Sequence, residues 1–287
     1  MTTDVSGARD VILAGENLRV GYGGSPIIDG VDIAIPRGEI TVIVGPNACG
    51  KSTLLRALSR VLPSSGVITL GGKTLAEMGA KEIARTMSML PQSPVTPDGI
   101  RVDELVARGR YPYQNVFGSW SAADEDAVAT AMEQAGISEH AARRVDELSG
   151  GQRQRVWLAM VLAQDTPLVL LDEPTTYLDI THQVEVLNLS RKLQQAGKTV
   201  VMVLHELSMA FRYATNLVVM KNGAIQAHGP VGEVVTPELI SAVYELECIL
   251  LEDPETGRPI VVPKDNSAPK DNQVSKDNQV SKDHEES

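Results

Sequence analysis

Hydrophobic residues along the chain fall into short runs typical of strands and longer periodic runs typical of helices. Alternating apolar residues over 11–44 predict a β-rich start that ends in the mostly apolar run 40–44. A helical pattern over 52–61 follows at once. Two later apolar runs, 168–171 and 199–204, have the length and composition of buried parallel strands.

The order of these runs indicates an α/β fold. A helix predicted over 182–195 separates the last two strands, as in a parallel sheet covered by helices. At about 93–162 the pattern is helical and predicts an inserted α-helical subdomain. A strand at 216–220 and the turn at 221–223 predict an antiparallel hairpin with 224–227. We therefore expect a mixed, mostly parallel sheet with an antiparallel β-subdomain and a helical insertion.

Residues 263–287 differ from the rest of the chain. The pair Lys-Asp recurs there every six residues, from Lys264 to Lys282, and almost no apolar residue is available to bury surface. We expect this hexapeptide-repeat tail to be disordered. The pattern is compatible with an interaction tail or with a solvated extension.

Composition narrows the classes of function. The 287 residues are 43% hydrophobic and 22% charged, as in ordinary globular proteins. The net charge of −11 argues against a nucleic-acid binder, which needs a basic face. No run approaches the ~20 apolar residues that cross a bilayer, and no signal peptide is expected. Two cysteines, Cys49 and Cys248, favour a reducing compartment.

The segment after the run 40–44 carries a phosphate-binding pattern between a predicted strand and a predicted helix. It matches G-x-x-x-x-G-K-S and reads Gly45-Pro46-Asn47-Ala48-Cys49-Gly50-Lys51-Ser52. Backbone N–H groups of such a loop surround nucleotide phosphates, Lys51 adds a positive charge, and the Ser52 hydroxyl can bind Mg²⁺. We include Thr53 in this site. The chain is therefore predicted to bind and hydrolyse ATP with Mg²⁺, and alkylation of Cys49 is expected to block ATP binding.

Two carboxylates follow the apolar run 168–171. Asp172 and Glu173 would lie at the carboxyl edge of the sheet, where ligands bind in such folds. Asp172 is the candidate ligand of Mg²⁺, directly or through water, and Glu173 is the candidate general base for the attacking water. Such a pair alone is a weak signal, but it is informative downstream of a phosphate loop.

A second glycine-containing helix start lies at 148–152. Its backbone N–H groups can bind another anion, and it includes Ser149, Gly150, Gly151 and Gln152. With this segment, residues 11–262 resemble the ATP-binding cassette (ABC) family, whose members are P-loop ATPases. The resemblance implies that Ser149–Gln152 bind the γ-phosphate held by the phosphate loop of a second subunit. It therefore implies a homodimer.

The resemblance assigns roles to further residues. Tyr22 lies where the family has an adenine-stacking aromatic residue, although it could also be a half-buried strand residue. Gln92 matches the glutamine that contacts Mg²⁺, and Asp179 matches the loop that crosses between subunits. His205 matches the histidine that contacts the γ-phosphate; a packed or capping histidine is the alternative. Where this chain has Ala48 the family more often has glycine, so a positive φ there would strain the loop.

Three stretches, 108–120, 173–183 and 229–244, resemble one branch of the family. It comprises ATPase subunits that drive bacterial uptake of iron–siderophore complexes, with vitamin B12 and haem importers as relatives. The resemblance implies integral membrane permease subunits as partners, an extracytoplasmic siderophore-binding protein as an indirect partner, and a place at the cytoplasmic face of the cell membrane. Residues 111–113 would either dock on the permease or pack their own loop.

Three other functions remain as alternatives. A soluble ABC ATPase of DNA repair or translation usually carries a long coiled-coil insertion or two cassettes, and the sequence indicates neither. A GTPase or kinase is disfavoured by the segment 148–152 and by the absence of an Asn-Lys-x-Asp motif. A non-catalytic nucleotide sensor is disfavoured by Glu173 and His205. The sequence does not identify the transported compound, because a cassette does not touch it.

Overall fold

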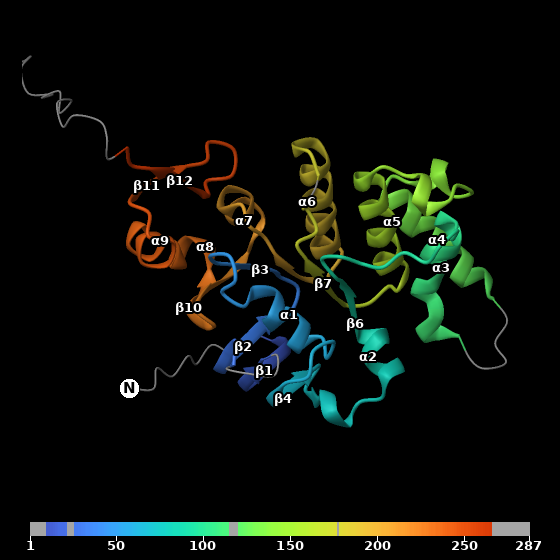
Figure 1. Cartoon of the computed structure of the whole chain (residues 1–287), viewed down its shortest axis with the longest axis horizontal. Helices are drawn as coiled ribbons and strands as arrows, with labels where there is room; N and C mark the ends of the chain where they lie inside the picture. The colour runs from blue at the N-terminus through green and yellow to red at the C-terminus, as the bar shows by residue number, and fades with distance from the viewer. Residues whose placement is uncertain (1–9, 22–25, 115–119, 177, 266–287) are drawn as a thin grey trace, which may run out of the picture.

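A six-stranded sheet forms the centre of the molecule (Figure 1). The structure is a computed structural model that describes residues 10–21, 26–114, 120–176 and 178–265. In order across the sheet the strands are β10 (Ala224–Pro230), β9 (Asn216–Lys221), β3 (Ile40–Val44), β8 (Thr199–Val203), β7 (Leu168–Asp172) and β6 (Met87–Leu90). Strands β10 and β9 are antiparallel, and all other neighbours are parallel.

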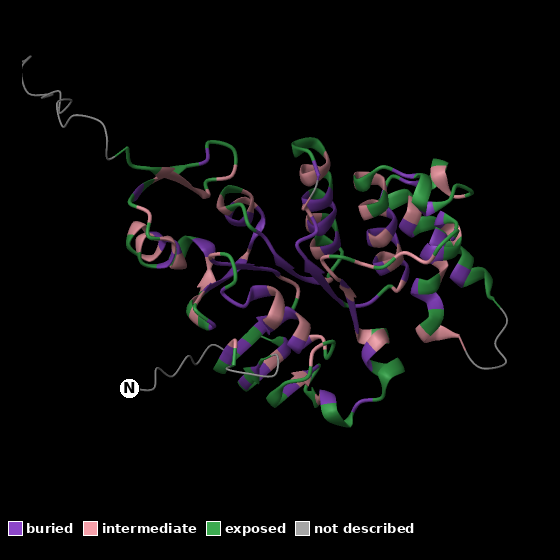
Figure 2. Ribbon diagram, in the orientation of Figure 1, coloured by how far each residue is buried: buried purple, intermediate pink, exposed green. Residues whose placement is uncertain are grey.

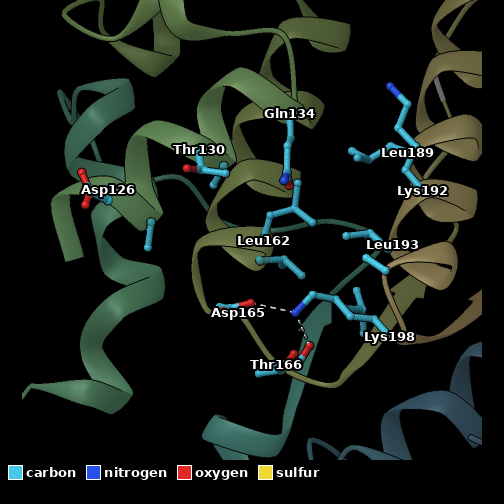
Figure 3. Close-up of a pocket in the computed structure, with 15 residues that line it drawn as sticks. Asp126, Thr130, Gln134, Leu162, Asp165, Thr166, Leu189, Lys192, Leu193 and Lys198 are labelled. Atoms are coloured by element: carbon cyan, nitrogen blue, oxygen red, sulfur yellow. Dashed lines mark hydrogen bonds and ion pairs between the residues drawn. The ribbon is translucent and has the colours of Figure 1, made fainter. Parts of the chain in front are cut away.

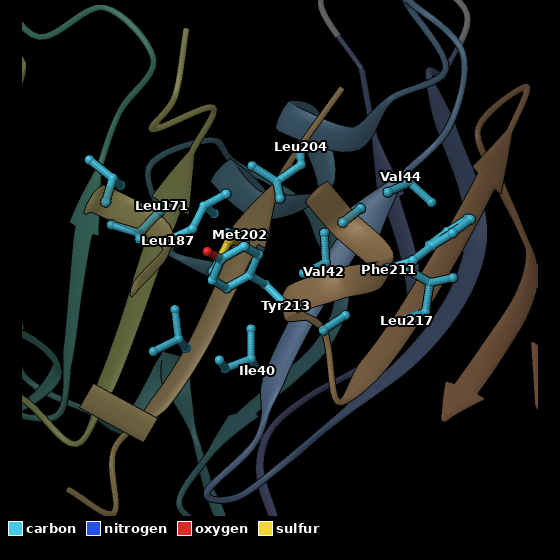
Figure 4. Close-up of a cluster of buried hydrophobic side chains, with 14 of the residues drawn as sticks. Ile40, Val42, Val44, Leu171, Leu187, Met202, Leu204, Phe211, Tyr213 and Leu217 are labelled. Atoms are coloured by element: carbon cyan, nitrogen blue, oxygen red, sulfur yellow. The ribbon is translucent and has the colours of Figure 1, made fainter. Parts of the chain in front are cut away.

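The central strands are continuously apolar because both faces of the sheet are covered. In β8, Val200 and Met202 join one buried cluster, while Val201 and Val203 join the cluster on the opposite face. The same alternation occurs in β3, β7 and β9. Figure 2 shows these strands as buried, and Figure 4 shows the first cluster around Met202. The two cores therefore hold the strand ends in fixed register.

Different elements cover the two faces. The first core is completed by α6 (Ile180–Gln195), α7 (Leu207–Tyr213), α8 (Val231–Val234), α9 (Pro237–Tyr244) and the hairpin of β11 (Cys248–Glu252) and β12 (Pro259–Pro263). The second core is completed by α1 (Lys51–Leu58), α2 (Ala80–Thr86) and a four-stranded antiparallel sheet of β2 (Ile28–Pro36), β1 (Val11–Val20), β4 (Ser65–Leu70) and β5 (Lys73–Thr74). This second sheet is the predicted antiparallel β-subdomain.

A helical layer stands beside the central sheet (Figure 1). It consists of α3 (Val102–Ala107), a 3-10 helix (Arg108–Tyr113), α4 (Ala122–Gln134) and α5 (Gly150–Ala163), and its three α-helices share a third buried cluster. Trp157 and Met160 of α5 also pack against the first core. Further 3-10 turns occur at Leu75–Glu77, Ser138–His140 and Val145–Glu147. Helix α5 thus joins the helical layer to the sheet.

A hollow of about 350 Å³ lies between α4, α5 and α6 (Figure 3). Gln134, Leu162 and Leu193 line it. At its lower end in the view, Lys198 Nζ lies 2.7 Å from Asp165 Oδ1 and donates to the Thr166 carbonyl oxygen at 3.0 Å. This ion pair ties the end of α5 to the start of β8.

The predicted α/β class with a mixed, mostly parallel sheet is confirmed. The hairpin predicted after 216–220 is present as β9 and β10. The boundaries 11–262 and about 93–162 stay predictions, and the predicted tail lies outside the described residues from 266 onward. None of the helices that the structure describes is both long and apolar enough to span a bilayer.

Residues 111–113 were predicted either to dock on the permease or to pack their own loop, and the segment contains one packed and one exposed tyrosine. The Tyr113 hydroxyl donates to the Gln164 carbonyl oxygen at 2.9 Å, and its ring lies 4.0 Å from the Arg110 guanidinium carbon. Tyr111, in contrast, is 57% exposed. Tyr113 therefore packs its own loop, and Tyr111 is the member available to a partner.

Arg110 fixes this loop to the helices behind it. Its Nε donates to Asp124 Oδ1 at 2.9 Å and its Nη1 donates to the Ala163 carbonyl oxygen at 2.8 Å. Both charged side chains are 10% exposed. Hydrogen bonds from Ser121 and then from Arg110 hold the pKa of Asp124 below its usual value. The pair is thus a buried ion pair with additional hydrogen bonds.

Replacing Arg110 by Met is expected to lower the free energy of unfolding by about 3 kcal/mol, since Asp124 would stay buried without its counter-ion. Equilibrium urea unfolding measures this loss. Because the folded pKa of Asp124 is lowered, its contribution is present at neutral pH and is lost as the pH falls through that lowered pKa. Arg144→Met, which removes an exposed pair with Asp146, is the control and should change stability little.

Candidate functional site

Four parallel strands end at one edge of the central sheet, and each is followed by predicted site residues. Strand β3 leads into the loop 45–50, β6 precedes Gln92, β7 ends at Asp172 before Glu173, and β8 precedes His205. Carboxyl ends of neighbouring parallel strands lie side by side, so these segments share one edge. The sheet therefore assembles the site from parts far apart in the sequence.

Glycines shape the loop between β3 and α1. A Cβ on Gly45 would lie 2.2 Å from the carbonyl oxygen of Met220 in β9, so no other residue fits there. Gly50 has φ 101° immediately before α1 begins at Lys51, in the left-handed region that favours glycine. The loop therefore turns tightly against the sheet and presents the start of α1.

Lys51 lies within the curve of this loop. Lys51 is only 4% exposed, and its Nζ donates to the Gly45 and Pro46 carbonyl oxygens at 2.8 and 2.9 Å. The ammonium group is thus held at the loop by backbone acceptors. A positive charge beside a helix N-terminus attracts phosphate groups.

Ala48 has φ 60°, which is the left-handed conformation that the sequence comparison with the family raised as a source of strain. An L-residue with a Cβ pays roughly 1–2 kcal/mol for that conformation. The cost belongs to the backbone conformation of the loop itself. It therefore acts on folding stability.

Replacing Ala48 by Gly is expected to raise the free energy of unfolding by roughly 0.5–1 kcal/mol, because relief of the left-handed strain exceeds the added flexibility of glycine. Urea unfolding measures the gain, and an ATP titration should give an affinity within about twofold of wild type. Ala48→Val is the opposing variant, since a β-branched residue tolerates positive φ less well. A lower stability for Ala48→Gly would contradict the strain argument.

Cys49 lies beneath the loop rather than on its open side. The residue is 4% exposed, and its Sγ is 2.8 Å from the position of a Cβ built on Gly45. Burial raises the pKa of the thiol, an effect that the charge of Lys51 partly offsets. The expectation that alkylation of Cys49 blocks ATP binding stays a prediction, and the burial and raised pKa of the thiol indicate that alkylating reagents react with it slowly.

Glu173 is the centre of a hydrogen-bonded group. Its Oε1 lies 2.6 Å from His205 Nε2, and its Oε2 accepts from Gln92 Nε2 at 2.6 Å and from the Thr176 hydroxyl at 3.2 Å. The residue is 8% exposed, whereas the His205 side chain is 42% exposed. Glu173 also has φ 53°, a conformation that non-glycine residues adopt mainly where the surroundings impose it. Three predicted site residues thus meet directly.

Asp172 contacts a residue that sequence reasoning missed. It is fully buried, and its Oδ2 accepts from Arg56 Nε at 3.2 Å and lies 3.0 Å from Arg56 Nη2. Its Oδ1 has no hydrogen-bond partner among the residues that the structure describes. Ser52 and Arg56 are four positions apart in α1 and share one helix face. That spacing is the signal by which Arg56 could have been found.

The second glycine-containing helix start lies away from the phosphate loop. The Ser149 hydroxyl accepts from the Gln152 backbone N–H at 3.3 Å, and Gln152 Oε1 accepts from the Ser149 N–H at 3.0 Å. Among the described residues, nothing lies within 4 Å of a Cβ built on Gly150, whereas a Cβ on Gly151 would lie 3.4 Å from Leu178 Cδ2, so the helix start is open at Gly150. Helix α5 packs against the first core, whereas α1 packs against the second core on the opposite face of the sheet. The structure therefore does not bring Ser149–Gln152 together with Lys51.

Asp179 has a local structural partner. Its Oδ1 accepts from the His182 backbone N–H at 3.0 Å and lies 2.7 Å from His182 Nδ1, so it caps α6. The backbone hydrogen bond from His182 is the largest cause of its lowered pKa. The side chain is 64% exposed, which leaves it accessible to a partner. Tyr22, the predicted adenine-stacking residue, lies outside the described residues.

A glycine loop around a buried lysine, next to a paired glutamate and histidine at the same sheet edge, defines a nucleotide-binding protein of the P-loop class. A family model described as ABC transporter matches residues 28–176. The chain belongs to the ABC transporter family, as its motifs predicted, and it is an ATP-binding subunit of that family.

The similar proteins cover nearly the whole chain. The ferric enterobactin transport ATP-binding protein FepC of Escherichia coli (strain K12) is 49% identical over 89% of this chain and 95% of its own length. The iron(3+)-hydroxamate import ATP-binding protein FhuC of Bacillus subtilis (strain 168) is 44% identical over 88% and 95%. The dimeric, post-hydrolysis structure of the ATP-binding cassette MJ0796 bound to ADP and Pi is 25% identical, covers 76% of this chain and 98% of its own, and has a TM-score of 0.67.

Proposed function

We propose that this chain is the ATPase subunit that energises import of iron–siderophore complexes. The observation that carries the proposal is the near-complete match, at 49% and 44% identity, to subunits named for ferric enterobactin transport and iron(3+)-hydroxamate import. The site supports ATP hydrolysis, because it pairs a phosphate-binding loop with a buried, hydrogen-bonded glutamate. The two relatives are named for chemically different siderophores, so their similarity supports iron–siderophore complexes as the class of cargo rather than one particular compound.

The chain's own residues supply the steps of hydrolysis. Lys51 and the loop N–H groups would bind the β- and γ-phosphates, since a positive charge and a helix N-terminus meet there. Glu173 would accept a proton from the attacking water. The imidazole N–H of His205 holds one carboxylate oxygen of Glu173, and the amide of Gln92 holds the other. These two contacts fix the orientation of the base before water arrives.

The residues at the sheet edge also fit a Mg²⁺ ion. Asp172 Oδ1 is buried without a hydrogen-bond partner in the described part of the chain, which is the state of a carboxylate oxygen that awaits a ligand. The donor set of Asp172, the Ser52 hydroxyl and the Gln92 amide oxygen consists of oxygen atoms, which Mg²⁺ prefers. When bound, the ion would offset negative charge on the phosphates. Asp172, Ser52 and Gln92 are therefore its proposed ligands.

A second copy of the chain would complete each site. The helix start at Ser149–Gln152 belongs to α5, which packs on the opposite face of the sheet from α1, so it would bind the nucleotide held by the partner subunit. The dimeric form of the similar cassette MJ0796 supports this arrangement. Asp179, exposed at the start of α6, would lie in the contact between subunits. A monomer is then expected to hydrolyse ATP poorly.

The assembly would operate at the cytoplasmic face of the cell membrane. Integral permease subunits would hold the ATPase dimer there, and an extracytoplasmic siderophore-binding protein would deliver the cargo. The exposed Tyr111, in the helical layer, is the proposed contact with the permease. Movement of that layer relative to the sheet would couple the nucleotide state to the membrane partner.

Uptake by a deletion strain tests the cargo. Cells lacking the chain are supplied with radiolabelled iron(III) bound to a catecholate or to a hydroxamate siderophore, and in separate arms with haem or vitamin B12. We expect loss of siderophore-bound iron uptake, restored by the wild-type chain and not by Glu173→Gln. Normal uptake from both siderophores would overturn the proposed cargo, and loss confined to haem or vitamin B12 would replace it.

A further inference from the structure

Asp172 carries a negative charge at a position that solvent does not reach. It is 0% exposed at the end of β7. A buried carboxylate is costly unless a cation or hydrogen-bond donors compensate it. Lys51 does not do so here, because its ammonium group donates to the Gly45 and Pro46 carbonyl oxygens instead. In the described part of the chain, the only cation within ion-pair distance of Asp172 is Arg56.

The contact between the two side chains is one-sided. Both Arg56 Nε and Arg56 Nη2 approach the same oxygen, Oδ2, at 3.2 and 3.0 Å. The other oxygen, Oδ1, is left buried and without a partner among the described residues. The Arg56 side chain is 32% exposed, so its outer part reaches solvent while its inner edge neutralises the carboxylate. One oxygen is therefore fixed and the other is available.

We propose that Arg56 is the positioning residue of Asp172 and the counter-ion that stabilises the site when it is empty. It acts through Asp172 and not on nucleotide. Its guanidinium group keeps the carboxylate compensated and oriented until a cation arrives at the free oxygen. The inference rests on the proposed Mg²⁺ site for that last step, but the ion pair itself can be tested without metal.

Loss of Arg56 should destabilise the empty protein more than the loaded protein. Without the guanidinium group, the buried charge of Asp172 destabilises the empty protein. Mg²⁺ with nucleotide then supplies the missing positive charge, so it stabilises such a variant more than it stabilises wild type. A residue that merely packs α1 would lower both stabilities equally.

Thermal unfolding of the full chain separates these cases. The variants are Arg56→Met, Arg56→Lys, Asp172→Asn and the double variant Arg56→Met/Asp172→Asn, each measured with EDTA and with the non-hydrolysable analogue AMP-PNP, with or without Mg²⁺. With EDTA, Arg56→Met is expected to lower the midpoint by about 5 °C. Arg56→Lys should lower the midpoint by less than half of that amount. In the Asp172→Asn background, loss of Arg56 should change the midpoint by less than about 1 °C.

These measurements test the Arg56–Asp172 ion pair separately from the proposed Mg²⁺ site. An equal loss in both backgrounds, or an unchanged midpoint for Arg56→Met, would overturn the proposal. If Arg56→Met does not fold, the double variant and Arg56→Lys still measure the coupling. A larger Mg²⁺-dependent shift for Arg56→Met than for wild type supports the counter-ion role. If AMP-PNP raises the unfolding midpoint of wild type equally with and without Mg²⁺, the proposed metal site is overturned. A smaller effect of Arg56→Met on the midpoint in the Asp172→Asn background would still support the ion pair.

Discussion

Replacing Glu173 by Gln is expected to lower ATP turnover by about 10²–10⁴-fold while ATP binding is retained. The amide is nearly the same size as the carboxylate, so it can still contact Gln92, Thr176 and His205. It cannot accept the proton that the attacking water must lose. Steady-state phosphate release measures turnover, and an equilibrium titration with a fluorescent ATP analogue measures binding.

The chain offers a matched control beside the same histidine. Glu206 follows His205 and is exposed, and within the described part of the chain it takes no part in the contacts around the Glu173 carboxylate. Glu206→Gln removes the same charge one residue from the site and should leave turnover within about twofold of wild type. Near-normal turnover in Glu173→Gln would refute the assignment of the general base. Equal losses in both variants would instead indicate a general effect of charge near His205.

Replacing Lys51 by Ala is expected to weaken ATP binding by on the order of 10²-fold, since a charge-assisted contact to phosphate contributes ~1.5–3 kcal/mol. The ammonium group has two roles in the structure. It carries the positive charge of the loop, and it donates to the Gly45 and Pro46 carbonyl oxygens. Its loss therefore removes a phosphate contact and loosens the loop that surrounds the phosphates.

Calorimetric titration with ATP measures the affinity of this variant, and circular dichroism confirms that it is folded. Lys192→Ala is the control of equal charge change, because Lys192 lies on α6 beside the hollow of Figure 3 and away from the loop. It should bind ATP as wild type does. Unchanged affinity in a folded Lys51→Ala protein would remove Lys51 from the nucleotide site.

The sheet and its edge could be predicted because local signals coincide there with the final structure. The runs 40–44, 168–171 and 199–204 are apolar on both faces, and they became the buried strands β3, β7 and β8. Polar residues that follow such strands must meet at one edge, which placed Asp172 and Glu173 in the site. The helices α7 and α9 and the hairpin of β11 and β12 were not predicted, since their apolar patterns are short.

The contacts that refine the site could not be read from the chain alone. Arg56 meets Asp172 across 116 positions of sequence. Its spacing from Ser52 places it on the site-facing side of α1, but that spacing does not identify Asp172 as its partner. The orientation of Cys49 beneath the loop depends on how closely Gly45 approaches β9. The φ of Ala48 was raised as a question by the residue type, but only the folded loop answered it. Tertiary packing decides each of these features.

Helix α5 connects the loop around Tyr111 to the helix start at Ser149. Near its carboxyl end, Arg110 and Tyr113 are tied to the carbonyl oxygens of Ala163 and Gln164, and its first turn begins after Ser149. Its 14 residues span about 20 Å without a proline or an internal glycine beyond the first turn. A movement of the loop around Tyr111 would therefore shift α5 as a rigid unit, and it would displace the helix start that is proposed to bind the partner's nucleotide.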